Sequence, residues 1–278
     1  MADNFNFTEY RVLARKYRPQ IFKDLVGQEM LVHILTNAII NNRIAHAYLL
    51  TGVRGIGKTT TARLIAMSLN CESRVADSFE PCGKCNSCIS IREDRNIDVI
   101  EIDAASKTGV EDIREIIDNV KYKPISCKYK IFIIDEVHML SKSAFNALLK
   151  TLEEPPSHVK FLFATTEVKK IPITIISRCQ RFDLNRIESS KLISYLLLIA
   201  KKEKIKIDND AIALIVRAAD GSARDGLSLL DQAIANEGDL ITVKTIIQML
   251  GLADQSKIFE LMDEIFKGNA NKSLKIFN

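Results

Sequence analysis

The sequence predicts an α/β fold, in which a parallel sheet covered by helices is followed by a small all-α unit. Three observations lead to this prediction. Short apolar runs typical of buried strands alternate with amphipathic helical patterns, a glycine-rich motif joins one such run to a helix, and after about residue 184 only helical patterns remain. Alternating strands and helices favour a parallel sheet, because its crossover connections place helices on the sheet faces.

Four apolar runs predict the strands of this sheet. Each run is short and rich in apolar residues, and the last follows a pair of prolines that ends the preceding helix. Runs of this length and character are typical of strands that are buried on both faces. The four runs are 47–51, 99–102, 131–134 and 159–164.

Two amphipathic stripes predict crossover helices between these strands. Apolar residues recur at positions i, i+3, i+4 and i+7, so they form one face of a helix that covers the sheet. The second stripe stops at Pro155 and Pro156, which cannot continue a helix. The stripes consist of Ile113, Ile116, Ile117 and Val120, and of Phe145, Leu148, Leu149 and Leu152.

The chain divides into three predicted units. The sheet unit spans 1–184 and carries an insertion at 71–88, and helical stripes then predict a separate small domain at 185–250. The remaining segment, 251–278, contains one more amphipathic stripe and ends without a glycine or proline stop signal. We therefore expect it to be the start of a further helical domain in a longer protein.

The composition is that of an ordinary globular protein. The chain has 278 residues, of which 47% are hydrophobic and 27% are charged. Apolar runs do not reach the roughly 18 to 20 residues of a membrane span, and the polar start lacks a signal-peptide pattern. These features predict a cytoplasmic protein without membrane contact. A net charge of +4 permits nucleic-acid binding without indicating it.

A phosphate-binding loop is predicted between the first strand and the helix after it. The chain reads Gly52-Val53-Arg54-Gly55-Ile56-Gly57-Lys58-Thr59, which satisfies G-x-x-x-x-G-K-[ST] in the required strand-to-helix context. Glycines let backbone N–H groups approach phosphate oxygens, Lys58 adds a cation, and Thr59 offers a hydroxyl to Mg²⁺. We expect these residues and Thr60 to bind ATP. The alternative, a chance glycine turn, is disfavoured by this placement.

An acidic pair closes the third predicted strand. Asp135 and Glu136 follow an apolar run, at the carboxyl edge where α/β sheets place their ligands. We expect Asp135 to hold Mg²⁺ through water and Glu136 to deprotonate the attacking water, since phosphoryl transfer needs little covalent help from the protein. In isolation such a pair is often only a solvated turn. Together with the phosphate loop it predicts nucleotide hydrolysis.

A cluster of cysteines predicts a structural zinc site. Cys71, Cys82, Cys85 and Cys88 provide four thiolates, with Pro81 and Gly83 shaping the turns between them. A closed shell of four sulfurs has no open position for substrate, so the site is expected to stabilise the insertion. An iron–sulfur cluster and unligated redox thiols remain alternatives. The other two cysteines, Cys127 and Cys179, are interpreted as packed thiols.

These motifs, taken in order, resemble the gamma/tau family of bacterial DNA polymerase III, the ATPases of the sliding-clamp loader. The resemblance covers essentially the whole chain and implies an AAA+ P-loop fold with a zinc-binding insertion and a helical lid. Several further segments look like that family. They are 14–19 (ARKYRP), 26–28 (VGQ), 102–106 (IDAAS), 145–155 (FNALLKTLEEP) and 177–179 (SRC).

The resemblance also implies roles for residues outside the phosphate loop. Thr166 would be the sensor that couples the γ-phosphate to the sheet, and Arg224 the second sensor, carried by the lid. Arg178 would act in trans on a neighbouring subunit's ATP, a role that suits the planar, permanently charged guanidinium. Without the resemblance, each arginine would be an ordinary surface charge. The adenine side is implied for Tyr17, Arg18 and Val26.

The implied partners are the delta and delta-prime type loader subunits, the sliding clamp and primer-template DNA. Lys107 and Arg114 could follow DNA phosphates, although Gly109 stands where relatives often carry another basic residue and a solvated helix face is the alternative. Gly226 is also unexpected, because it lies inside a lid helix. The family's oligomerising region lies beyond this segment, so the piece alone is expected to be monomeric or weakly associated.

The functional prediction is therefore an ATPase subunit of the clamp loader within a holoenzyme that has DNA-directed DNA polymerase (nucleotidyltransferase) activity. Two alternatives belong to other classes. A zinc-carrying P-loop nucleoside kinase would phosphorylate a small acceptor but lacks the trans arginine motif and the helical lid. A non-hydrolysing loader scaffold would lose the phosphate loop, and intact Lys58, Thr59, Asp135 and Glu136 argue against it. The gamma and tau forms are indistinguishable in this segment.

Overall fold

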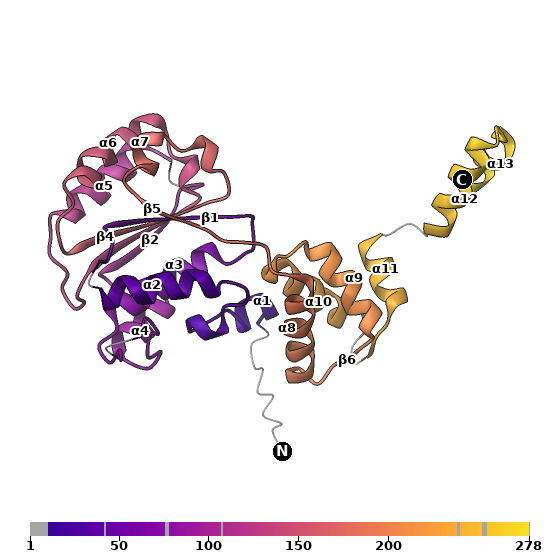
Figure 1. The fold of residues 1–278 in the computed structure, drawn as a ribbon, viewed down its shortest axis with the longest axis horizontal. Coiled ribbons are helices and arrows are strands. Elements are labelled where there is room, and N and C mark those ends of the chain that lie inside the picture. The colour runs from indigo at the N-terminus through magenta and orange to yellow at the C-terminus, as the bar shows by residue number, and fades with distance from the viewer. Residues whose placement is uncertain are drawn as a thin grey trace, which may run out of the picture.

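The computed structural model describes residues 11–277, apart from 42, 76–77, 107, 238–239 and 252–254. A five-stranded sheet forms the centre of the larger domain (Figure 1), with its strands in the order β2-β3-β4-β1-β5 and every pair parallel. The four predicted strands are confirmed within about one residue at each end. The strands are β1 (Ala47–Thr51), β2 (Val99–Asp103), β3 (Lys130–Asp135), β4 (Val159–Thr165) and β5 (Gln180–Asp183).

The fifth strand, β5, was not predicted from the sequence. It lies at the edge of the sheet beside β1, and of its four residues only Phe182 is buried. Three of the residues are polar or charged, so the segment lacks the apolar run that marks the other strands. Its pairing with β1 is a long-range contact that local pattern does not reveal.

Helices cover both faces of the sheet. In Figure 1, α5, α6 and α7 lie on one face, while α2, α3 and α4 lie on the other. The predicted stripes of 113–120 and 145–152 pack against β3 and β4, where Phe161 stacks on both Phe132 and Phe163. The helices of this domain are α1 (Leu13–Lys16), α2 (Glu29–Ile40), α3 (Lys58–Asn70), α4 (Asn86–Arg92), α5 (Val110–Val120), α6 (Lys142–Glu153) and α7 (Ile173–Ile176). Three short 3-10 turns are η1 (Phe22–Asp24), η2 (Val137–Met139) and η3 (Val168–Lys170).

The second unit, here called the lid, is mainly helical, as predicted. It consists of α8 (Ser189–Lys202), α9 (Asn209–Ala219), α10 (Ala223–Glu237) and α11 (Val243–Leu250). The expectation of helices alone was wrong in one detail, because β6 (Lys206–Ile207) pairs in parallel with β7 (Leu240–Ile241). Two-residue strands are too short to give a periodic signal. A Cβ at Gly226 would make ordinary contacts with Leu196 and Ala219, so packing does not require glycine in α10.

Two further helices, α12 (Gln255–Phe266) and α13 (Ala270–Phe277), pair with each other and lie apart from the lid (Figure 1). Apolar side chains on both, including Phe259, Phe266 and Phe277, are exposed. No helix in the described parts of the chain is both long enough and apolar enough to span a membrane.

The N-terminal segment connects several parts of the molecule. Helix α1 packs on α10 of the lid, and the backbone N–H of Leu13 donates to Asp231 Oδ2 at 3.4 Å. Further along, Phe22 packs against Phe79 of the cysteine-bearing insertion, with ring centroids 5.1 Å apart. Gln28 Nε2 then donates to the carbonyl of Asn185, in the linker between the sheet and the lid.

A buried carboxylate, Asp98, fixes the loop that leads into β3. Its side chain accepts the backbone N–H groups of Ile125 (2.8 Å), Ser126 (2.7 Å) and Cys127 (2.9 Å). Burial by itself raises the pKa of Asp98, but these hydrogen bonds outweigh it and hold the pKa below the ordinary value. The charged form is therefore the one that stabilises this loop.

Replacing Asp98 by Asn is expected to lower the free energy of unfolding at neutral pH by about 1 to 3 kcal/mol, because charge-assisted bonds to backbone N–H groups are lost. Since the folded pKa lies below the unfolded value of 3.8, the stabilisation is complete above that value and is lost as the pH falls through the folded pKa. Denaturant titrations of both proteins should show the difference shrinking below about pH 4. A pH-independent difference would contradict this explanation.

Candidate functional site

The phosphate loop lies between the end of β1 and the start of α3, as the sequence predicts. Gly52, Gly55 and Gly57 have φ angles of 148°, 75° and 102°, a region that residues with a Cβ rarely adopt. Lys58 is 5% exposed, and its Nζ donates to the carbonyls of Gly52 (3.1 Å) and Val53 (3.0 Å). The Lys58 side chain therefore lies inside the loop and binds its backbone carbonyls.

The charge of Lys58 is partly balanced by the acidic pair. Burial lowers the pKa of Lys58 below its ordinary value, while Glu136 and Asp135 oppose this effect. Thr59 donates its hydroxyl to Asp135 Oδ2, so the first turn of α3 is joined directly to the end of β3. A hydroxyl and a carboxylate side by side are the hard oxygen ligands that Mg²⁺ prefers. The donor set therefore fits a Mg²⁺ ion held together with phosphate.

Glu136 and Thr166 meet at the carboxyl edge of the sheet. The backbone of Glu136 is left-handed, with φ 45° and ψ 44°, which is uncommon for a residue with a side chain. One carboxylate oxygen, Oε2, accepts both the backbone N–H of Thr166 (3.2 Å) and its hydroxyl (3.0 Å). Within the described residues no hydrogen bond is made to the other oxygen, Oε1.

The lid sits directly on the phosphate loop. A Cβ added to Gly55 would lie 2.1 Å from Ser222 Oγ, so glycine is needed for this close approach. The backbone N–H of Arg224 donates to the carbonyl of Gly55 at 3.3 Å. The start of α10 is therefore in contact with the loop, and Arg224 lies on the lid next to it.

Two neighbouring residues of the N-terminal segment turn in different directions. Arg18 is largely buried and its Nε donates to Thr60 Oγ1 at 3.0 Å, on the first turn of α3. Burial lowers the pKa of Arg18, nearby Arg63 lowers it further, and Glu101 opposes them. Tyr17 points to the lid instead, where its hydroxyl donates to Glu203 on the turn that ends α8.

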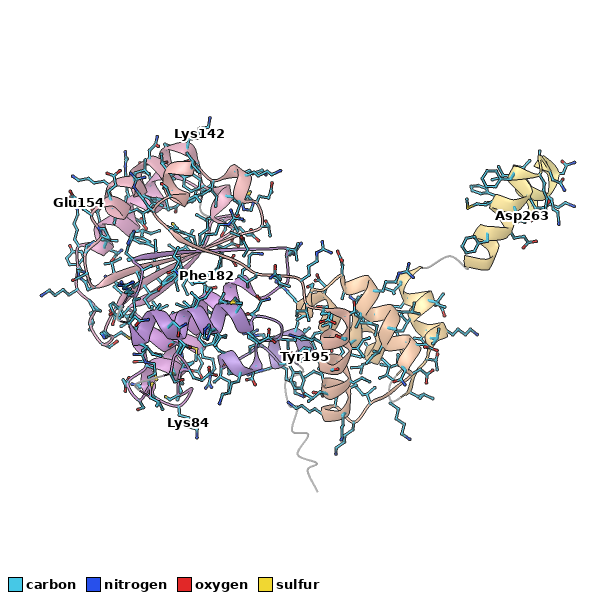
Figure 2. The ribbon with its side chains drawn as sticks, viewed as in Figure 1. Lys84, Lys142, Glu154, Phe182, Tyr195 and Asp263 are labelled. Atoms are coloured by element: carbon cyan, nitrogen blue, oxygen red, sulfur yellow. The ribbon has the colours of Figure 1, made fainter. Side chains whose placement is uncertain are left out.

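The environment of Tyr17 is hydrogen-bonded and charged. Its pKa is raised to about 12 by burial and by Glu203. Tyr195 of α8 donates to the Tyr17 carbonyl at 3.4 Å and lies where the lid meets the N-terminal segment (Figure 2). Val26 is half-buried against the core. It precedes Gly27, where an added Cβ would contact Ile187. An adenine contact of Tyr17 and Val26 stays a prediction.

Arg178 follows α7, beyond β4. Its Nη2 lies 2.6 Å from Glu153 Oε1, and its Nη1 donates to the carbonyl of Thr174 at 2.6 Å. The side chain is 31% exposed, and it contacts Glu153 on α6 and Thr174 on α7 rather than the phosphate loop. Of the two predicted DNA contacts, Lys107 lies outside the described residues. Arg114 is exposed on α5 and pairs with Glu111 at 2.6 Å.

The four clustered cysteines converge on one point. Their sulfur atoms all lie within 4.8 Å of one another, which is compatible with the roughly 3.8 Å between sulfurs that a tetrahedral zinc with 2.3 Å bonds requires. Backbone N–H groups point at the sulfurs: Cys82 donates to Cys71 at 3.3 Å, Cys85 to Cys82 at 3.2 Å, and Cys88 to Cys85 at 3.4 Å. These donors favour thiolates, so the residues fit a bound metal ion.

The thiols of this cluster differ in acidity. Burial works against the Cys82 thiolate, but the backbone N–H groups of Lys84 and Cys85 lower its pKa to about 6. Burial raises the pKa of Cys71 and Cys88. The remaining thiols are packed elsewhere, as the sequence indicates: Cys127 lies 3.7 Å from Ser87 Oγ, and burial raises the pKa of Cys179 to about 12.

Sequence reasoning missed one residue of this site. His138, for which the sequence predicts no role, lies against Thr165, Glu136 and Glu167. Its only sequence signal is its position two residues after Glu136, where a turn from the strand end can bring it back to the carboxyl edge of the sheet.

Comparison with known proteins assigns the family. The model for "DNA polymerase III, delta subunit" matches residues 27–188, that for the clamp loader subunit ATPase lid domain matches 192–238, and that for domain III of the gamma and tau subunits matches 241–278. DNA polymerase III subunit gamma of Buchnera aphidicola subsp. Acyrthosiphon pisum is 48% identical over 97% of this chain and 74% of its own length. The chain belongs to the DNA polymerase III gamma/tau family.

Longer members of the gamma/tau family match equally well. The tau subunits of Salmonella typhimurium and Escherichia coli are each 48% identical over 97% of this chain, which spans 42% of their length. Among solved structures, the RuvB Holliday junction branch migration motor of Thermotoga maritima has a TM-score of 0.59 at 17% identity, covering 90% of this chain and 79% of that one. The fold is therefore that of an AAA+ ATPase with a helical lid.

Proposed function

We propose that this member of the gamma/tau family is the ATP-hydrolysing motor of a bacterial sliding-clamp loader. One observation carries the proposal. Lys58, the Thr59–Asp135 pair and the Glu136–Thr166 pair lie together under a lid that touches Gly55. Groups for binding phosphate, holding Mg²⁺ and activating water are thus combined with a lid that can respond to the nucleotide.

The phosphate loop and the start of α3 would bind the phosphates. Backbone N–H groups of residues 52–60 and the positive end of the helix dipole attract the phosphate oxygens. Lys58, already desolvated, exchanges its bonds to loop carbonyls for bonds to phosphate. Mg²⁺, when bound at Thr59 and Asp135, would neutralise phosphate charge in the transition state.

Activation of water falls to Glu136. Thr166 holds Oε2 of this residue, so Oε1 can accept a proton from water in line with the terminal phosphate. We propose that Thr166, the residue after β4, senses that phosphate. We assign Arg224 to the sensing of nucleotide by the lid, and Arg18 to the same side of the loop through its contact with Thr60.

Arg178 is proposed to act on a neighbouring subunit. In this chain its guanidinium is directed to Glu153 and Thr174, on α6 and α7, and it is partly exposed. An arginine presented at the surface can enter a neighbour's site and stabilise charge on the transferring phosphoryl group. Hydrolysis would then depend on assembly.

The other functional assignments follow from the family. We propose that the partners are delta and delta-prime type subunits, the sliding clamp and primer-template DNA, and that the protein works in the cytoplasm. Arg114 on the exposed face of α5 remains a candidate DNA contact. We further propose the domain division 1–184, 185–250 and 251–278, with the last unit beginning an oligomerisation domain to which the exposed apolar side chains of α12 and α13 belong.

The cysteine cluster is proposed to bind one Zn²⁺ that stabilises the insertion. Four convergent sulfurs form a closed shell, and Cys85 also caps α4 by accepting the N–H of Cys88. The insertion packs on α3 and, through Phe79, on Phe22 of the N-terminal segment. A structural ion here would keep those contacts in place without entering the chemistry.

The first prediction from the proposed function separates binding from turnover. Lys58→Ala is expected to weaken ATP binding, because Lys58 meets phosphate in the ground state, whereas Glu136→Gln should keep binding and lose turnover by roughly 100-fold or more. ATP binding would be measured by calorimetry, and hydrolysis with the full-length subunit, the other loader subunits, clamp and primed DNA. Wild-type turnover by the Glu136→Gln complex would rule out the proposed base.

The second prediction concerns assembly. Arg178→Ala should leave ATP affinity of the single chain unchanged but lower DNA-stimulated hydrolysis of the assembled loader by about 10³-fold, as is typical for a transition-state arginine. Arg181→Ala, which removes an exposed arginine on β5, is the matched control. Full DNA-stimulated turnover in an assembly where every Arg178 is replaced would make Arg178 an ordinary surface residue.

The third prediction concerns the metal. Freshly purified protein should contain one zinc per chain, measured by elemental analysis. Cys85→Ser should lower the thermal midpoint of unfolding, whereas ATP affinity should largely survive. Cys179→Ser, which alters a partly buried thiol outside the cluster, serves as the comparison. Protein without zinc, or with iron and sulfide instead, would contradict the assignment.

A further inference from the structure

His138 lies between two carboxylates at the edge of the sheet. It belongs to the short turn η2 after β3, and its side chain is only 6% exposed. Its Nδ1 lies 3.0 Å from Thr165 Oγ1 and 3.4 Å from Glu136 Oε2, while its Nε2 lies 3.5 Å from Glu167 Oε1. The ring therefore connects the residue after β3 with the residues that end β4.

The Nδ1 side of the ring is the one that faces the reacting groups. Thr165 is fully buried and adjoins Thr166, which binds the same Glu136 oxygen that Nδ1 approaches. The Nε2 side faces Glu167, a half-exposed carboxylate that already pairs with Lys170 at 2.9 Å. A proton on Nδ1 can be shared between Thr165 Oγ1 and Glu136 Oε2, so the ring ties both strand ends together.

Glu136 needs such support. Its left-handed backbone is strained for a residue with a side chain, so the surrounding contacts must hold it there. The backbone N–H of Glu136 donates to Asp135 Oδ1 at 2.9 Å, which fixes only the main chain. The carboxylate is held at its tip, by Thr166 and by the neighbouring histidine.

We propose that His138 is a positioning residue for hydrolysis, which holds the Glu136 carboxylate and the Thr165–Thr166 strand end in register. This inference rests on the proposed role of Glu136 as the base. His138 acts through Glu136 rather than on the nucleotide itself. It acts by fixing Oε2 of Glu136, so that Oε1 keeps one orientation toward the water.

The test uses three substitutions of His138 in the full-length subunit, assembled with its partner subunits, clamp and primed DNA. The amide of Asn can replace the Nδ1 side of the ring, the longer Gln can replace the Nε2 side, and Leu replaces neither. We expect His138→Leu and His138→Gln to lower kcat by roughly tenfold or more, as befits disturbance of a general base. His138→Asn should recover most of kcat, and KM for ATP should stay within about twofold in all three.

Coupling to Glu136 gives a readout that a purely structural role would not produce. In the Glu136→Gln background, adding His138→Leu should cause no further loss of kcat, because the group it positions has already been removed. His158→Leu is the matched control, since this half-buried histidine bonds to the Val120 carbonyl at the opposite end of β4. Its kcat should remain that of the wild type.

The possible outcomes distinguish a failure of this inference from a failure of the proposed role of Glu136. Three outcomes would overturn the inference while leaving Glu136 as the base. They are a wild-type kcat in His138→Leu, equal losses of kcat in His138→Asn and His138→Gln, and a further loss of kcat when His138→Leu is added to Glu136→Gln. Wild-type turnover in Glu136→Gln would remove the base and the inference together. If His138→Leu fails to fold, as judged by its thermal midpoint, the Asn and Gln variants decide the question by themselves.

Discussion

The hydrogen bond from Thr59 to Asp135 joins the two halves of the functional site, and the other contacts are arranged around it. Thr59 lies in the first turn of the helix that follows β1, whereas Asp135 ends β3, and β4 lies between these strands. Parallel strands place all their carboxyl ends at one edge, so the loop after β1, the acidic pair after β3 and the threonines after β4 meet there. The ladder of the sheet thus sets the distances among groups that are far apart in the sequence.

Charge around the phosphate loop is unbalanced in a way that favours an anion. Lys58 and Arg18 are both buried enough for desolvation to lower their pKa values, and Arg18 also lies near Arg63 and Arg224. Glu101 takes up much of the charge of Arg63, in an ion pair with Nη2 at 2.7 Å from Oε1. Bound phosphates would offset the remaining repulsion, to which the lid contributes through Arg224 of α10.

The N-terminal segment gives the site a physical connection to the rest of the molecule. Tyr17 bonds to the lid, Arg18 bonds to the first turn of α3, and Phe22 packs on the insertion that carries the four cysteines. A movement of the lid relative to the sheet must therefore strain or release contacts at the phosphate loop. The insertion takes part in this arrangement by packing Phe79 against Phe22 of the segment.

Features that depend on short stretches of sequence were predictable without the structure. The four buried strands, the phosphate loop, the acidic pair and the cysteine cluster all follow from short runs whose spacing reflects strand or helix geometry. Which side chains meet depends on the tertiary fold. β5 pairs through a run with one buried residue, Tyr17 and Arg18 contact different domains, and His138 contacts a residue of another strand. These contacts join residues far apart in the chain. Their geometry depends on strand order and on packing of the lid, which local periodicity does not encode.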